Sequence, residues 1–324
     1  MSANPTAAPA VAVPSRETRQ FAVAFAVLAA AVAIAPFVAY PFFVMEALCF
    51  ALFACAFNLL IGYVGLLSFG HAMFLGSASY VCAHAAKVWG LDPVAAILVG
   101  VACSSVLGFV VGALSIRSQG IYFAMITVAF AQMIYFFCVE APFTHGEDGI
   151  QGVPQGRALG LVDLSQPALL YVFVAAVFLF GFFTVYRAVN SPFGEILKAI
   201  RENEPRAISL GYRVQRYKLA AFTLSAALAG LAGATKAIVV QNASLTDVAF
   251  PMSGEVVLMT LLGGMGTLYG PVVGAIVVVS MQNYLAQYGQ WVTVIQGAVF
   301  VVCVLAFRRG IVGEIAKALK WTSL

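Results

Sequence analysis

The segment Ser191–Tyr217 reads SPFGEILKAIRENEPRAISLGYRVQRY, and it is the one long charged stretch in an otherwise apolar chain. Its apolar residues Ile196, Leu197 and Ile200 recur at helical spacing, so they share one face of a helix whose other face is charged. This pattern predicts an amphipathic helix that lies flat between two apolar segments.

The ends of this helix are marked by residues with specific backbone roles. Ser191 can cap its start, and Pro192 suits its first position. Asn203 can cap a second short helix, which Gly211 can end in a left-handed conformation. The stretch is therefore predicted to be a short helix-turn-helix. It is either a solvated connection or a docking element, since its apolar face needs a partner to bury against.

The composition excludes a soluble protein. Of the 324 residues, 62% are hydrophobic and 9% are charged, against about a quarter charged in soluble domains. Lipid must cover so much apolar surface, and only helices or closed barrels satisfy the backbone there. We predict an all-α polytopic membrane protein. The net charge of +4 does not indicate nucleic-acid binding, because the positive residues flank the apolar segments.

About ten transmembrane helices (8–10) are expected within residues 21–307. The candidate spans are residues 21–40, 42–61, 66–86, 93–115, 121–141, 168–187, 217–240, 253–267, 270–287 and 291–307. Residues 1–20 are predicted to be a disordered tail, and residues 308–324 a C-terminal tail. The first apolar run could imitate a signal peptide, but its length favours an uncleaved span.

The distribution of positive charge predicts the orientation. All but three of the 17 Lys and Arg residues lie in the two tails, near Arg117 or in residues 187–218. The positive-inside rule therefore places both termini and the loop 188–217 in the cytoplasm, and the loop 142–167 outside.

Two glycine-rich stretches, Asn58–Gly76 and Leu261–Gly274, interrupt the apolar pattern, one in each half of the chain. Paired breaks of this kind point to an inverted repeat around a transport pathway. Tight helix packing is the other interpretation, and the two are compatible. The candidate pathway residues are Asn58, Tyr63, Ser68, His71, Gln132, Gly263, Gly264 and Gly266.

His71 either lines a wet cavity or bonds to backbone freed beside the glycines, and the structural role is favoured. Asn58 and Gln132 carry the same two interpretations. No phosphate-binding loop, paired metal-ligand histidines or Ser-His-Asp set is present, and the six cysteines all lie in apolar runs. We therefore predict no enzyme, no metal and no cofactor.

Five segments in register resemble LivM-type permease subunits of ABC importers for branched-chain amino acids. They are NLLIGYVGLLSFGHAMFLGSASY (Asn58–Tyr80), YFAMITVAFAQMI (Tyr122–Ile134), THGEDGIQGVP (Thr144–Pro154), Ser191–Ala234 and SGEVVLMTLLGGMGTLYGPVVGA (Ser253–Ala275). The chain departs from the family pattern at His145, where glycine is usual. It departs again at Pro205, where the coupling signature of ABC permeases has glutamate.

The resemblance implies a transport subunit of a bacterial inner membrane, driven by a separate ATPase subunit. It also implies a second permease subunit, hence a heterodimer, and a periplasmic binding protein. The implied ATPase-coupling residues are Glu195, Lys198, Arg201, Glu202, Asn203, Glu204, Ala207 and Gly211, with Leu197 and Ile200 as the buried contact. The implied binding-protein contacts are Thr144, His145 and Asp148.

Other functions remain open at this point. Permeases that resemble this chain serve branched-chain amino acids, urea or short amides, or aromatic acids. A secondary transporter would need ion-coupling carboxylates in the membrane, and a scaffold would gain nothing from interrupted spans.

Overall fold

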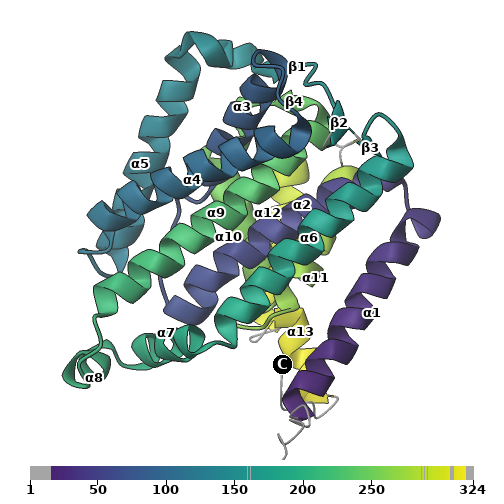
Figure 1. Cartoon of the computed structure of the whole chain (residues 1–324). Helices are drawn as coiled ribbons and strands as arrows, with labels where there is room; N and C mark the ends of the chain where they lie inside the picture. The colour runs from purple at the N-terminus through teal and green to yellow at the C-terminus, as the bar shows by residue number, and fades with distance from the viewer. Residues whose placement is uncertain are drawn as a thin grey trace, which may run out of the picture.

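A computed structural model describes residues 16–158, 160, 162–285, 287, 289, 291–306 and 310–318. The described chain is a bundle of helices with two small two-stranded sheets at one end (Figure 1). The predicted all-α architecture is confirmed. Residues 1–15 of the expected tail lie outside the described residues.

The helices of the bundle follow the chain in order and are separated by short connections. They are α1 (Arg16–Val38), α2 (Pro41–Asn58), α3 (Ala72–Lys87), α4 (Pro93–Ser115), α5 (Ile121–Glu140), α6 (Pro167–Val189), α7 (Pro192–Glu202), α8 (Glu204–Ser209), α9 (Val214–Val240), α10 (Phe250–Gly263), α11 (Gly270–Leu285), α12 (Trp291–Ala306) and α13 (Gly310–Ala318). A π-helical turn, η1 (Leu59–Val64), continues α2, and 3-10 turns η2 (Pro142–Thr144), η3 (Gly146–Asp148) and η4 (Leu245–Asp247) lie in loops.

Each of the ten predicted spans contains a helix, with corrected ends. Five helical segments of the described chain are long and apolar enough to cross a membrane: 41–64, 93–115, 121–140, 167–189 and 214–240. The chain is therefore a multi-pass membrane protein, while ten crossings stay a prediction. Helix α1 begins at Arg16, inside the expected tail. Helix α10 ends at Gly263, because Gly264 has a positive φ that no helix accommodates.

The core of the bundle is α2, which packs against α6, α9, α10 and α11. Its side chains Leu52, Phe53 and Phe57 are fully buried. Small residues let α9 approach its neighbours closely, and Ser104 on α4 donates a hydrogen bond of 2.7 Å to the Ala226 carbonyl. Helix α2 is apolar on all sides because other helices surround it.

The two ends of the bundle differ in character. The strands β1 (Ile150–Gln151) and β4 (Asn242–Ala243) pair antiparallel at one end, beside the hairpin of β2 (Arg157–Ala158) and β3 (Val162–Asp163). Helices α7, α8 and α13 and the start of α1 lie at the other end (Figure 1). The loops expected outside thus gather at one end, and the segments expected inside gather at the other.

Helices α2 and α10, which precede the two glycine breaks, run parallel to each other along the bundle. Glu46 near the start of α2 and Glu255 near the start of α10 both lie within electrostatic reach of Lys236 and Asp247. The far ends of α2 and α10 also meet, through Asn58. The prediction that these two breaks are inverted counterparts is therefore wrong, because inversion would make α2 and α10 antiparallel.

A buried ion pair lies at the strand end of the bundle, near the starts of α2 and α10. The Lys236 ammonium is bonded to the Asp247 carboxylate, whose residue is 2% exposed, and it lies 5.0 Å from the centre of the Phe50 ring. Glu46 and Glu255 lie within electrostatic reach of the same lysine, and Asp247 is its bonded partner. Each of these charges taken alone is compatible with a position facing water, so the sequence does not reveal the cluster.

We predict that Asp247→Asn lowers the free energy of unfolding by about 3 kcal/mol or more, because it leaves the Lys236 ammonium buried without its partner. Unfolding in detergent micelles measures the change. The matched control, Glu195→Gln, breaks an exposed pair with Lys198 and should cost about 0.5 kcal/mol or less. Equal effects of the two substitutions would show that the buried pair has no special role.

Candidate functional site

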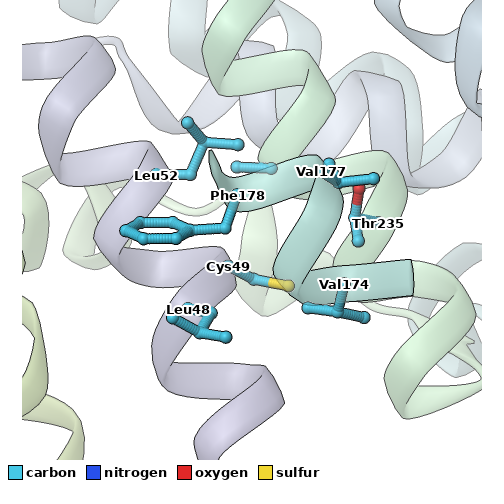
Figure 2. A pocket seen from close by; sticks show the side chains of 8 residues that line it. Leu48, Cys49, Leu52, Val174, Val177, Phe178 and Thr235 are labelled. Atoms are coloured by element: carbon cyan, nitrogen blue, oxygen red, sulfur yellow. The ribbon is translucent and has the colours of Figure 1, made fainter. Parts of the chain in front are cut away.

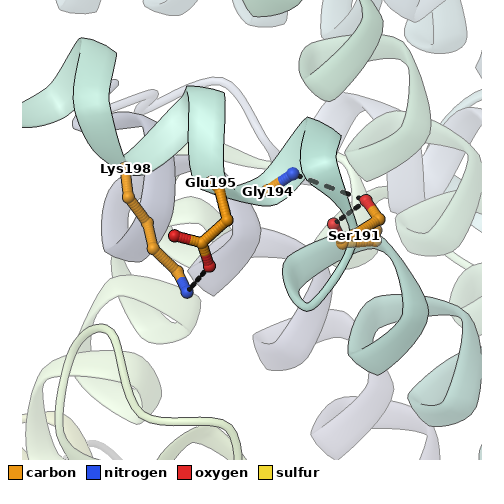
Figure 3. A network of polar contacts seen from close by, with 5 residues as sticks. Ser191, Gly194, Glu195 and Lys198 are labelled. Carbon is orange, nitrogen blue, oxygen red and sulfur yellow. Dashed lines mark hydrogen bonds and ion pairs between the residues drawn. The ribbon is translucent and has the colours of Figure 1, made fainter.

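The segment 188–217, called here the coupling segment, forms the predicted helix-turn-helix. The Ser191 hydroxyl accepts the Gly194 N–H at 3.4 Å and donates to the Ala188 carbonyl at 2.7 Å, which fixes the start of α7 (Figure 3). The Asn203 side chain accepts the Arg206 N–H at 3.0 Å and starts α8. Gly211 has φ +87° and ends it. The predicted caps and stop are confirmed.

The apolar face of α7 is turned into the protein itself. Leu197 is 0% exposed and Ile200 is 3% exposed, and Ile200 packs with Ala207 and Val214. The expectation that Leu197 and Ile200 supply a contact for another subunit is wrong, because α6, α9 and η1 already cover them. These side chains seat the helix on the bundle.

The exposed apolar residues of the coupling segment lie further along the chain. Ile208 is 58% exposed, Leu210 is 69% exposed, and Tyr212 is also exposed. Arg206 and Arg213 are exposed beside them. Sequence periodicity does not reveal this surface, because its residues lie around a turn and do not recur at helical spacing.

Ion pairs hold the segment in shape. Lys198 pairs with Glu195 one turn away at 2.8 Å (Figure 3), an exposed pair that contributes little. Glu204 pairs at 2.8 Å with Lys218 of α9, whose side chain is buried. Glu204 therefore fixes α8 against α9 within this chain. Of the predicted coupling residues, Glu202, Asn203 and Gly211 are exposed, and Ala207 is buried.

The two glycine-rich stretches meet directly beside α7. We call the meeting point, residues 62–71 and 263–269, the glycine junction. The Asn58 amide donates to the Thr267 carbonyl at 2.8 Å and accepts the Gly266 N–H at 3.0 Å. A Cβ on Gly62 would lie 2.8 Å from the Gly266 nitrogen, so only glycine allows this approach.

Other predicted pathway residues are buried near this junction. The Ser68 hydroxyl accepts the Gly70 N–H at 3.4 Å, and Tyr63 is buried. His71 lies among Phe53, Phe57 and Phe74, with ring centres 5.3 to 5.8 Å apart. None of Ser68, Tyr63 and His71 is exposed in the described chain.

The hydrogen bond of His71 favours its structural role. Its Nε2 lies 3.1 Å from the Ser225 hydroxyl, which donates to the Ala56 carbonyl three residues before the π-helical turn. Histidine thus reaches a backbone carbonyl of the interrupted helix through Ser225. Gln132 is half-buried on α5 and makes no hydrogen bond with described residues, so the structure does not join it to the others.

A pocket between α2, α6 and α9 is apolar (Figure 2). Its lining residues are Leu48, Cys49, Leu52, Val174, Val177, Phe178, Ala232 and Thr235. It is too narrow for a water molecule, and its one hydroxyl, on Thr235, donates to the Leu231 carbonyl at 2.7 Å. This pocket cannot bind the charged groups of an amino acid.

The predicted outer contact separates into buried and exposed parts. Thr144 is fully buried, and its hydroxyl donates to the Cys138 and Ala141 carbonyls at the end of α5, so it closes that helix. His145 and Asp148 are exposed. His145 has φ +60°, which explains why glycine is usual at this position. In the same loop, a backbone hydrogen bond from Ser165 lowers the pKa of Asp163.

Comparison with known proteins adds the family context. The family model described as "Branched-chain amino acid transport system / permease component" matches residues 41–305. The chain is 26% identical over 283 residues to "High-affinity branched-chain amino acid transport system permease protein LivM" of Escherichia coli (strain K12), covering 78% of this chain and 65% of that protein. No solved structure matches the chain.

Two further relatives share this region. "Probable branched-chain amino acid transport permease protein LivM" of Methanocaldococcus jannaschii is 25% identical over 232 residues, covering 66% of this chain and 64% of that protein. "Ribose import permease protein RbsC" of Bacillus subtilis is 28% identical over 238 residues, covering 68% and 70%. The chain thus spans less than two thirds of the length of the E. coli and M. jannaschii relatives.

We predict that Asn58→Ala destabilises the protein by about 2 kcal/mol or more, because it leaves the Gly266 N–H and the Thr267 carbonyl without partners. The control is Asn190→Ala, at an exposed residue whose side chain makes no hydrogen bond with described residues, and it should change stability little. Thermal unfolding in detergent compares the two. A loss no larger for Asn58→Ala than for the control would mean that Asn58 does not hold the two breaks together.

Proposed function

Because the chain belongs to the family of branched-chain amino acid transport permease components, we propose that it is the membrane permease subunit of an ATP-driven importer. The proposed substrates are branched-chain amino acids, which two of the relatives above are named for. The chain would change no bonds in its substrate. Its proposed place is the inner membrane of a bacterium.

The observation that carries this proposal is the coupling segment. Ile208, Leu210 and Tyr212 expose apolar side chains among arginines, at the end of the bundle where the chain concentrates positive charge. An exposed apolar patch rimmed by charge is typical of a protein–protein contact. We propose that this patch binds an ATPase subunit. That subunit would supply the energy for transport, because the sequence of this chain contains no nucleotide-binding loop.

The orientation follows from charge. Among the Lys and Arg residues of the described chain, only Lys87, Arg157 and Lys236 belong to the strand end of the bundle. The end that holds α7 and α8 is therefore proposed to face the cytoplasm. The strand end would face outward, where His145 and Asp148 are the exposed predicted contacts for a substrate-binding protein.

The proposed mechanism depends on the tight packing of α7 against the rest of the bundle. The buried Leu197 and Ile200 fix α7 to η1 and α9, so a movement of the coupling segment must move these elements. Closure of an ATPase dimer would push the segment and thereby alternate access to a pathway. A second permease subunit would complete the pore.

The buried charge cluster supports a second candidate, a secondary transporter. Glu46, Asp247 and Glu255 lie within electrostatic reach of Lys236 near the strand end of the bundle, and one oxygen of Glu255 has no hydrogen-bond partner among the described residues. Carboxylates buried in a membrane protein can carry coupling ions. The coupling segment would have no role in such a transporter.

Reconstitution separates the two candidates. The chain would be incorporated in liposomes with the ATPase, second permease and binding protein of its own transport system, and labelled leucine uptake followed. The proposed function predicts uptake that requires ATP. Uptake that continues without ATP and follows a proton or sodium gradient would overturn it in favour of a secondary transporter.

We predict that combining Ile208→Asp with Leu210→Asp abolishes retention of the ATPase subunit during purification, because two charges would be buried in the contact. ATP-dependent uptake should fall with it. The control Ser209→Asp adds a charge to a polar, exposed position between them and should retain the ATPase. Full retention by the double variant would place the docking surface elsewhere.

A further inference from the structure

We infer that Arg201 is the positioning residue that transmits movement of the coupling segment to the glycine junction. The inference rests on the proposed function and names the contact through which that function operates. Arg201 lies in the last turn of α7, and its guanidinium donates to the Gly62 carbonyl, 139 residues away in the chain. Gly62 lies in the π-helical turn that ends α2.

The side chain of Arg201, an exposed residue, lies against space that two glycines leave open. A Cβ added to Gly65 would lie 3.2 Å from its Cγ, and a Cβ on Gly266 would lie 3.3 Å from its Nη1. Both glycines have positive φ, +79° and +76°. A side chain at Gly65 or Gly266 would crowd Arg201, so the arginine reaches the Gly62 carbonyl because both breaks turn at glycines.

Electrostatics favours a cation at this place. The last carbonyls of a helix have no partner within the helix, and the helix dipole makes that end negative. Arg201 lies beside the C-terminal ends of two helices at once, α2 with η1 and α10. Its charge is thus attracted to both ends, and its fork of donors satisfies the Gly62 carbonyl.

No other charged group of α7 makes this connection within the described chain. Lys198 pairs outward with Glu195, and Glu204 at the start of α8 pairs with Lys218 of α9. Leu197 and Ile200 give packing contacts, which hold α7 on the bundle but have no preferred bonding direction. The bond from Arg201 to Gly62 is directional, so it fixes the rotation of α7 relative to the junction.

The π-helical turn η1 can change conformation more easily than a regular α-helix when Arg201 moves. Its backbone hydrogen bonds are rarer and less regular than those of an α-helix, and it often marks functional sites. When α7 moves, Arg201 either draws η1 with it or releases Gly62. Because Asn58 joins the base of η1 to Gly266 and Thr267, the movement reaches α10 and α11 as well.

The first test measures coupling in the reconstituted full transporter. In Arg201→Gln, leucine molecules imported per ATP hydrolysed should fall about tenfold or more, while the ATPase subunit stays bound. Arg201→Lys keeps the charge without the fork and should fall between the wild type and Arg201→Gln. Arg117→Gln removes an exposed arginine that bonds to no described residue, at the same end of the bundle, and should match the wild type.

An unchanged ratio in Arg201→Gln would overturn the inference. Loss of the ATPase subunit from Arg201→Gln would also overturn it, since Arg201 would then serve docking. A wild-type transporter whose uptake ignores ATP would instead overturn the proposed function, and this outcome is visible before any substitution is made.

The second test needs no transport. Spin labels at Ala199 on α7 and Met265 in the junction report the distance between them in lipid nanodiscs, and both residues are exposed. Arg201→Gln should broaden or shift the distance distribution, and Arg117→Gln should not. Identical distributions for Arg201→Gln and the wild type would show that packing alone positions α7, which contradicts the inference.

Discussion

The structure depends on one constraint: a helix that breaks inside an apolar bundle leaves backbone groups that must find partners within the protein. The helical path is interrupted after α2 and again after α10, and groups at each interruption form hydrogen bonds with groups at the other. Asn58 supplies both a donor and an acceptor to the second break, and Arg201 satisfies a carbonyl of the first. Glycines at 62, 65 and 266 make the approach close enough for these bonds. Where the two breaks meet, the chain therefore has a polar centre in an apolar protein.

This centre explains why the coupling segment lies where it does. Helix α7 is amphipathic, but its apolar face is used to seat it on the bundle, and its final turn places Arg201 at the junction. The surface left for a partner lies around α8 and the turn after it, at Ile208, Leu210 and Tyr212. Seating and docking are therefore carried by different residues. In the proposed mechanism, a push on the proposed docking surface is passed on because α7 is tightly packed on the bundle.

The helix caps and stops could be predicted from the sequence, whereas hydrogen bonds between residues far apart in the chain could not. Ser191, Asn203 and Gly211 act within three residues of themselves, so the caps and the stop of the helix-turn-helix followed directly from residue type. Hydropathy located the helices. Helical periodicity also identified Leu197 and Ile200 as an apolar face, but it could not say whether that face meets this chain or another. Asn58 and Thr267 are 209 residues apart, and no pattern connects them. The pairing of Lys236 with Asp247 was missed because each charge alone looked compatible with water.

The most direct measurement of the central claim is hydrogen exchange at the Gly266 amide of the unmodified protein in nanodiscs. An amide in a glycine-rich turn normally exchanges fast, since few buried contacts hold such a segment. The account predicts that Gly266 N–H, bonded to Asn58 Oδ1, is protected about as strongly as the amides of α10. Exchange at Gly266 as fast as in the outer loop around Gly152 would contradict it, because the two breaks would then not be joined.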